Sequence, residues 1–217
     1  MRVKVCGIKT EQELETAVSA GADAVGFLVG QVHASHDFIL ASTAARLVRM
    51  LPPYVVPVLV THLTKPETIL ELAEQTSIFT IQLHGGSSPE EVAALRDRLG
   101  PAGKLVYAAH VVDQQVVPPP DPYYAFADAL LLDSMDPAAG KVGGTGLTHN
   151  WNVSAAIAAS APVPVVLAGG LNPLNVAAAV RHVRPFAVDA NSGLRRFDGD
   201  LDRNLCSAFV WNAKNAI

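Results

Sequence analysis

Residues 3–29, VKVCGIKTEQELETAVSAGADAVGFLV, contain an apolar strand, a helix and a second apolar strand in succession. Residues 3–8 and 24–29 have the short, β-branched character of buried strands. Residues 11–20 between them have helix-forming composition, with Thr10 as the expected N-cap and Gly21 as the stop signal. Two apolar strands joined by a helix predict a parallel sheet with both faces covered.

The same alternation continues along the chain. Further strands are expected at residues 55–61, 79–84, 105–111, 129–133, 163–167 and 186–189, and further helices at 42–50, 66–75, 89–99, 153–160, 173–183 (capped by Asn172) and 201–213. The proline-rich stretch VVDQQVVPPPDPYY, residues 111–124, is not expected to hold a full helix. Eight strand–helix units predict an α/β fold, a single (β/α)₈ TIM barrel over residues 1–217. The alternative is a doubly wound open sheet, which usually has fewer strands.

Composition excludes several classes of protein. The chain has 217 residues, of which 50% are apolar and 17% charged, so a packed globular domain is expected. A net charge of −4 without a basic stripe argues against nucleic acid as a partner. The apolar runs are too short for a membrane span or a signal peptide. The two cysteines, Cys6 and Cys206, cannot form a disulfide framework, and a reduced, cytoplasmic protein is expected.

Two reactive side chains stand at the carboxyl ends of expected strands, where TIM barrels carry their chemistry. Cys6 ends the first strand and Asp133 ends the strand ALLLD. Together they suggest a general base and a general acid. A cysteine base needs a depressed pKa or a substrate-aligned proton, and an aspartic acid donor needs a pKa raised by a partly desolvated mouth. The alternatives are a buried small apolar residue and a structural cap.

Two glycine-bearing turns, AGGLNP and ANSGL, follow the last two expected strands. Gly169, Gly170, Ser192 and Gly193 in these turns are candidates for binding a phosphate through backbone N–H groups, although they could simply permit tight turns. The stretch GKVGGTGL, residues 140–147, lacks the Walker spacing. It is expected to be a loop that closes over the mouth, or else a passive flexible loop.

Histidines give a weaker signal. His84 and Gln82 share one face of their expected strand and either line the mouth or form a packing pair. His33 and His36 fall in an expected loop, and no HxH or HExxH pattern occurs, so no metal site is expected from spacing.

Several stretches, among them VKVCGIKTEQELETAVSAGADAVGF, IQLHGGSSPEEV, ALLLDS, VVLAGGLNPLNVAAAV and RPFAVDANSGL, resemble the phosphoribosylanthranilate isomerase family of tryptophan biosynthesis in the same order. The resemblance implies a (β/α)₈ barrel and an Amadori rearrangement of a small-molecule phosphoribosyl amine, without cofactor or metal. It implies that Asp133 is the acid and Cys6 the base. It also places the phosphate at the turns of Gly169, Gly170, Ser192 and Gly193. Gln82, His84 and Asp189 are candidates for contacting the substrate because they stand at the carboxyl ends of expected strands.

The resemblance weakens where the family binds the anthranilate carboxylate. Asp37 stands where the family has an arginine, which replaces a carboxylate clamp with a repulsive charge. His36 is a partial substitute if protonated. Leu147, Asn150 and Arg195 are further departures.

Anthranilate is the default amine, but a different amine or a non-catalytic phosphosugar-binding paralogue stays open. Another barrel isomerase or lyase would need a metal or a Schiff-base lysine, for which Lys4 is the candidate on the first strand. The sequence leaves monomer and homodimer equally open.

Overall fold

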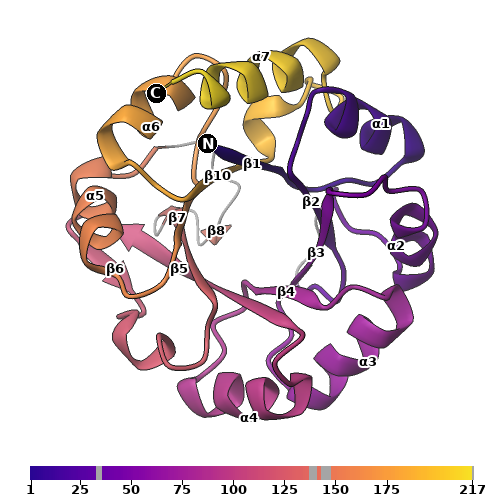
Figure 1. Cartoon of the computed structure of the whole chain (residues 1–217), viewed down its shortest axis with the longest axis vertical. Coiled ribbons are helices and arrows are strands. Elements are labelled where there is room, and N and C mark those ends of the chain that lie inside the picture. Colours follow the sequence, from indigo (N-terminus) through magenta and orange to yellow (C-terminus); the bar gives the residue numbers. More distant parts are fainter. Residues whose placement is uncertain (33–35, 137–140, 143–147, 217) are drawn as a thin grey trace.

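Eight parallel strands close into a barrel that is surrounded by helices in a computed structural model of the chain, which describes residues 1–32, 36–136, 141–142 and 148–216 (Figure 1). The strands are β1 (Arg2–Val5), β2 (Ala24–Leu28), β3 (Val56–Thr61), β4 (Thr80–Leu83), β5 (Lys104–Val112), β7 (Ala129–Asp136), β9 (Val165–Leu167) and β10 (Ala187–Ala190). Pairing of β1 with β10 and of β5 with β7 completes the closed sheet. The predicted TIM barrel is confirmed.

The helices occupy the outside of the barrel. They are α1 (Glu11–Ser19), α2 (Ala41–Val48), α3 (Pro66–Thr76), α4 (Pro89–Leu99), α5 (Trp151–Ser160), α6 (Val176–Val183) and α7 (Arg203–Lys214). Between β5 and β7 the chain forms an antiparallel strand, β6 (Gln115–Val117), and a 3₁₀ turn, η1 (Asp121–Tyr123). The proline-rich stretch therefore holds no full helix, as predicted. No helix in the described ranges is long and apolar enough to cross a membrane.

Capping side chains help to decide where the helices begin, and one predicted helix start is wrong. Thr10 caps α1 by accepting a hydrogen bond from the backbone N–H of Glu13. The last helix before β10 begins at Val176 and not at residue 173. Asn172 accepts from the backbone N–H of Leu174 instead of capping a helix there, and this local bond holds the chain in a turn.

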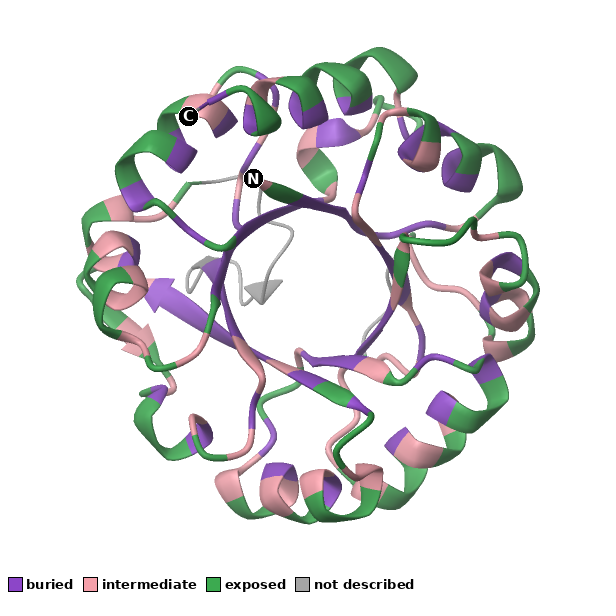
Figure 2. Ribbon diagram, in the orientation of Figure 1, coloured by how far each residue is buried: buried purple, intermediate pink, exposed green. Residues whose placement is uncertain are grey.

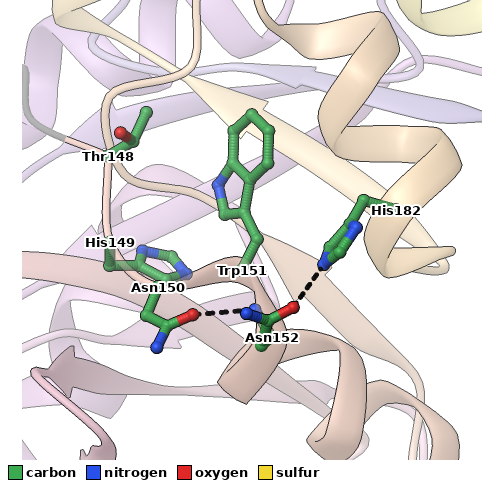
Figure 3. A pocket seen from close by; sticks show the side chains of 6 residues that line it. All are labelled: Thr148, His149, Asn150, Trp151, Asn152 and His182. Carbon is green, nitrogen blue, oxygen red and sulfur yellow. Dashed lines mark hydrogen bonds between the residues drawn. The ribbon is translucent and has the colours of Figure 1, made fainter.

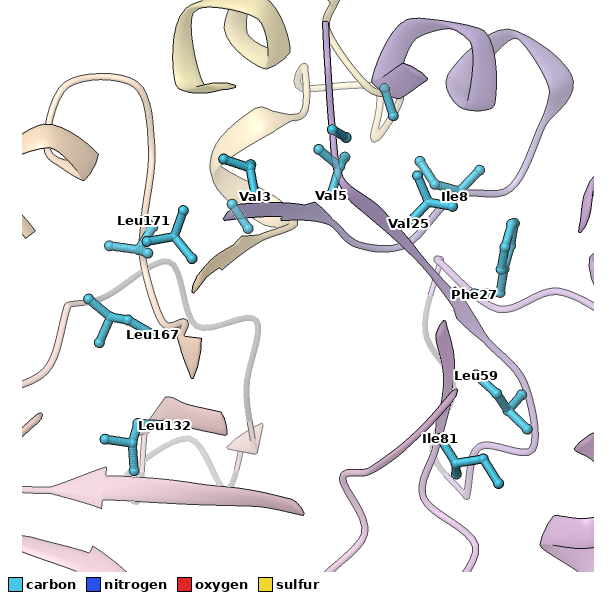
Figure 4. Close-up of a cluster of buried hydrophobic side chains, with 14 of the residues drawn as sticks. Val3, Val5, Ile8, Val25, Phe27, Leu59, Ile81, Leu132, Leu167 and Leu171 are labelled. Carbon is cyan, nitrogen blue, oxygen red and sulfur yellow. The ribbon is translucent and has the colours of Figure 1, made fainter. Parts of the chain in front are cut away.

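Most residues of the barrel strands are buried (Figure 2), and strand alternation divides their side chains into two sets. One set, which includes Val3, Val5, Phe27 and Leu59, belongs to the main apolar core between the strands and the helices (Figure 4). The other set faces the barrel interior, because successive strand residues point to opposite faces. At the carboxyl ends of the strands this second set is polar: Cys6, His84, His110, Asp133 and Asp189. These ends position the candidate site.

Candidate active site at the barrel mouth

Cys6 lies directly after β1 and is only 7% exposed. Its side chain has room because the neighbouring strand carries Gly26, where a Cβ atom would lie 2.6 Å from the Cys6 sulfur. Lys4, two residues earlier, forms a buried ion pair of 2.7 Å with Oδ2 of Asp189. These two residues are register partners on β1 and β10. A thiol, an ammonium and a carboxylate therefore share one side of the mouth.

The electrostatics of this group keep the thiol protonated at neutral pH. Burial raises the pKa of Cys6 to about 11, although the charge of Lys4 acts in the opposite direction. Burial alone would lower the pKa of Lys4, but the Asp189 carboxylate and the Cys6 thiolate outweigh it, and the pKa is raised. Lys4 is thus a cation held beside the sulfur. Of the two routes by which a cysteine can act as a base, a depressed pKa is not found for Cys6, which leaves alignment of the proton by the substrate.

Asp133 lies on β7, which is three strands from β1 around the barrel, and is 7% exposed. Its Oδ2 lies 3.5 Å from Nε2 of His84, and its Oδ1 accepts a 2.7 Å hydrogen bond from the backbone N–H of Ser134. Burial works to raise the pKa of Asp133, but the contacts with His84 and the charge of His110 outweigh burial, so the pKa is lowered. The expectation of a raised pKa is wrong in direction, because the sequence did not reveal two imidazoles beside the carboxyl.

His84 is held in place by Gln82, which lies two residues earlier on the same face of the strand. Nε2 of Gln82 lies 3.2 Å from Nδ1 of His84, so the two side chains contact each other, and Gln82 is buried. His110, on β5, is the register partner of Asp133, and its ring lies edge-on to that of His84 at 5.4 Å. Burial lowers the pKa of His110 to about 4. Sequence reasoning missed His110, although its even spacing from Val106 and Ala108 places it on the inward face.

The two glycine-bearing turns meet each other at the same end of the barrel. Gly169 and Gly170 have φ angles of +83° and +61°, which side-chain-bearing residues rarely adopt. Gly193 is packed so closely that a Cβ atom there would lie 2.1 Å from the carbonyl oxygen of Leu171. Among the described residues, the backbone N–H groups of Gly170, Ser192 and Gly193 donate to no protein acceptor. Unused donors on adjoining turns are suited to an anion.

Asp37 is not the isolated repulsive charge that the sequence suggested. Its Oδ2 accepts a 2.8 Å hydrogen bond from Nδ2 of Asn191, and its Oδ1 lies 3.5 Å from Nε of Arg195. Two departures from the family pattern, an acid at 37 and a base at 195, thus compensate each other. Local charge at this part of the mouth is close to balanced.

Arg195 is buried and makes contacts with several parts of the site. Nη1 lies 2.8 Å from Glu13 Oε1, Nε donates to Asn191 Oδ1 at 2.6 Å, and Nη2 donates to the carbonyl of Gly7. The guanidinium therefore fixes the Cys6–Gly7 turn to the loop after β10. His36 is exposed on the adjacent loop.

Some sequence predictions fall outside the described residues. Of GKVGGTGL, only residues 141–142 are described, as the short strand β8 (Lys141–Val142) paired antiparallel with the end of β7. The proposed closing loop and Leu147 are therefore not placed.

A separate pocket lies where α5 begins and is lined by Thr148, His149, Asn150, Trp151, Asn152 and His182 (Figure 3). Asn150, one of the departures, caps α5 there by accepting from the backbone N–H of Asn152. None of the residues predicted from sequence to hold the substrate lines this pocket.

Comparison with known proteins identifies the family of the chain. A family model described as N-(5'-phosphoribosyl)anthranilate (PRA) isomerase matches residues 3–212. N-(5'-phosphoribosyl)anthranilate isomerase 2 of Methanosarcina mazei is 42% identical over 215 residues, which cover 99% of this chain and 95% of that protein. The chain belongs to the N-(5'-phosphoribosyl)anthranilate isomerase family.

Solved structures agree with this family. Phosphoribosyl anthranilate isomerase from Thermotoga maritima superposes with a TM-score of 0.85 at 34% identity, covering 99% of this chain and 98% of that chain. A second family structure, in complex with reduced 1-(o-carboxyphenylamino)-1-deoxyribulose 5-phosphate, gives a TM-score of 0.81 at 33% identity, covering 99% of this chain and 98% of that one.

Proposed function

We propose that the chain catalyses the Amadori rearrangement of N-(5'-phosphoribosyl)anthranilate to 1-(2-carboxyphenylamino)-1-deoxyribulose 5-phosphate, with Asp133 as general acid and Cys6 as general base. The observation that carries the proposal is the convergence of a carboxyl, a thiol and two glycine-bearing turns at one end of the barrel. Family membership supplies the reaction, and the geometry supports the roles of the residues.

The first step is protonation of the ribose ring oxygen, which opens the ring to a Schiff base. Burial works to raise the pKa of Asp133, but its contacts with His84 and the charge of His110 lower it. Nε2 of His84 lies 3.5 Å from Oδ2 of Asp133, so the imidazole is placed to relay a proton to this carboxyl. Gln82 orients this imidazole from the other side, since its amide nitrogen lies 3.2 Å from Nδ1. Gln82 and His84 thus act through Asp133.

The second step is removal of the C2′ proton, which gives an enolamine that tautomerises to the ketone. Cys6 has a pKa of about 11, so roughly one site in ten thousand carries a thiolate at pH 7. A thiolate that forms is a strong base, and the Lys4 ammonium favours it electrostatically. A substrate bound against the Cys6 sulfur would align its C2′ proton with the sulfur, as a cysteine base without a depressed pKa requires. Asp189 acts by holding Lys4 in place at 2.7 Å.

The substrate's phosphate is proposed to bind at the turns of Gly169, Gly170, Ser192 and Gly193, where N–H groups without an acceptor among the described residues can donate to its oxygens. The anthranilate carboxylate is then left to the side of the mouth near His36 and Asp37. Because Arg195 and Asn191 compensate the Asp37 charge, a carboxylate is tolerated there. It gains no bidentate clamp, which predicts weak binding of the aryl group.

The test is conversion of phosphoribosylanthranilate by the purified protein, followed by the loss of substrate fluorescence, together with rescue of a tryptophan auxotroph that lacks this step. Turnover and rescue are expected. A folded protein that does not convert this substrate, but converts a phosphoribosylated amine without the carboxylate, would support the different-amine alternative. Rescue of a biological role by a variant lacking both Cys6 and Asp133 would support a non-catalytic paralogue.

We place the reaction in the cytoplasm, where the free thiols of Cys6 and Cys206 stay reduced. The assembly is proposed to be a monomer or a homodimer, and sedimentation equilibrium distinguishes the two.

A further inference from the structure

Imidazoles gather on one side of the barrel mouth, around the proposed catalytic acid. His84 and His110 follow or end neighbouring strands, β4 and β5, and Asp133 lies on β7, which pairs with β5. One ligand atom from each of these three residues lies within 4.8 Å of the other two. The ring of His62, which follows β3, lies 5.7 Å from that of His84. Two nitrogens and a carboxylate oxygen thus converge on one point.

His110 is the member of this cluster that the isomerase reaction does not use. It is 7% exposed, and its Nδ1 has no hydrogen-bond partner within the described part of the chain. A buried polar nitrogen without a partner is uncommon in folded proteins and calls for a reason. A metal ion, which accepts an electron pair from nitrogen, would be a partner for Nδ1 of His110. The neighbouring His84 and Asp133 also offer ligand atoms for a metal ion.

The spacing of the ligand atoms is close to what a metal requires. In tetrahedral zinc sites, metal–nitrogen and metal–oxygen bonds of about 2.1 Å separate neighbouring ligand atoms by roughly 3.4 Å. Nε2 of His84 and Oδ2 of Asp133 already lie 3.5 Å apart. The ligand atom of His110 lies within 4.8 Å of both. Gln82 lies 3.2 Å from Nδ1 of His84; with its amide turned so that the oxygen accepts from Nδ1–H, it would leave Nε2 of His84 free for a metal, as outer partners of metal-bound histidines commonly do.

We propose that His84, His110 and Asp133 bind a divalent transition-metal ion of the zinc type, and that the bound ion inhibits the isomerase. Two imidazoles and one carboxylate favour zinc, cobalt or nickel over magnesium and calcium, which prefer oxygen ligands. Three protein ligands leave a fourth position open to water or substrate. Inhibition rests on the proposed function, because the ion occupies the carboxylate and the imidazole that would protonate the ribose ring.

Spacing along the sequence cannot detect such a site. HxH and HExxH patterns find ligands that share one strand or helix, whereas these three residues come from different strands, 26 and 23 positions apart, and the sheet brings them together.

The experiment titrates the full-length protein, stripped of metal with a chelator, with Co²⁺ and separately with Zn²⁺. Wild type should bind one ion per chain by calorimetry and show the visible absorption of tetrahedral Co²⁺. His110→Gln should weaken binding by at least about 100-fold, since loss of even an outer partner costs roughly 10–100-fold. His182→Gln, which alters an exposed histidine far along the chain, is the matched control and should bind as wild type does.

Two further variants keep the result unambiguous. Cys6→Ala should retain the Co²⁺ spectrum, which excludes the thiol as the ligand. His110→Asn repeats the test if His110→Gln does not fold, with melting curves as the criterion. Zn²⁺ should inhibit wild-type turnover and should inhibit His110→Gln far less. Absence of one-to-one binding by wild type, or equal binding by His110→Gln, overturns the metal site. Binding without inhibition leaves the site standing and counts against Asp133 as the acid.

Discussion

Arg195 lies at the centre of a buried charge cluster, and its removal should have a large, measurable effect. Replacing it with methionine keeps the volume but removes the cation that lies 2.8 Å from Glu13 Oε1. Glu13 is 4% exposed, and its second cation, Lys9, is more distant at 3.8 Å. Breaking a buried ion pair by removing one partner costs about 3–5 kcal/mol. Because Lys9 and two backbone N–H groups still contact Glu13, the lower end, about 3 kcal/mol, is expected.

For a chain of this length, each kcal/mol lowers the melting temperature by about 2–4 °C, so Arg195→Met should melt about 6–12 °C below wild type. Arg196→Met is the matched control, since the neighbouring arginine is half exposed and forms its ion pairs with Asp198 and Asp200 at the surface. Exposed ion pairs contribute little to stability. Differential scanning calorimetry at pH 7 measures both. Equal melting temperatures for the two variants would refute the assignment of Arg195 as the central cation. Turnover should also fall in Arg195→Met, because the guanidinium holds the carbonyl of Gly7 beside the base.

Three other changes have defined outcomes. Gly26→Ala should lower kcat and stability, because the new methyl would lie 2.6 Å from the Cys6 sulfur; kcat near wild type would show that the sulfur has room to move. In Cys206→Ala protein, the remaining thiol, Cys6, should ionise near pH 11, as followed by its ultraviolet absorbance. Because the ordinary pKa of a cysteine is 9.0, the folded state should lose stability as the pH rises from about 9 to about 11. A melting temperature that stays constant over this range would contradict the burial of Cys6. Gly193→Ala should weaken phosphate binding and raise KM, because its Cβ would lie 2.1 Å from the carbonyl oxygen of Leu171; an unchanged KM would remove this turn from the site.

Much of the fold could be predicted from the sequence because the strands are buried on both faces. The alternation of apolar runs with helical stretches gave the eight units of the barrel, and the prolines after β5 correctly indicated where a helix is missing. The start of α6 was misplaced by three residues, since Asn172 bonds to the turn and not to a helix. Capping side chains have alternative local partners, and sequence alone does not choose between them.

The pKa values and the charge pairing in the site were harder to predict from the sequence. Position at a strand end located Cys6 and Asp133, but their pKa values depend on groups from other strands. Burial raises the pKa of Cys6 despite the charge of Lys4, and contact with His84 lowers the pKa of Asp133. The compensation of Asp37 by Arg195 joins residues 158 positions apart, so each looked like an unexplained change by itself.

Turnover of phosphoribosylanthranilate by Cys6→Ala and Asp133→Asn, beside Cys206→Ala as the matched loss of a thiol, tests the central claim most directly. A positioned acid or base contributes about 10²–10⁴-fold to the rate, so kcat of each of the first two variants should fall by that factor while that of Cys206→Ala stays at the wild-type value. A folded Cys6→Ala or Asp133→Asn protein with kcat within a few-fold of wild type would contradict the account.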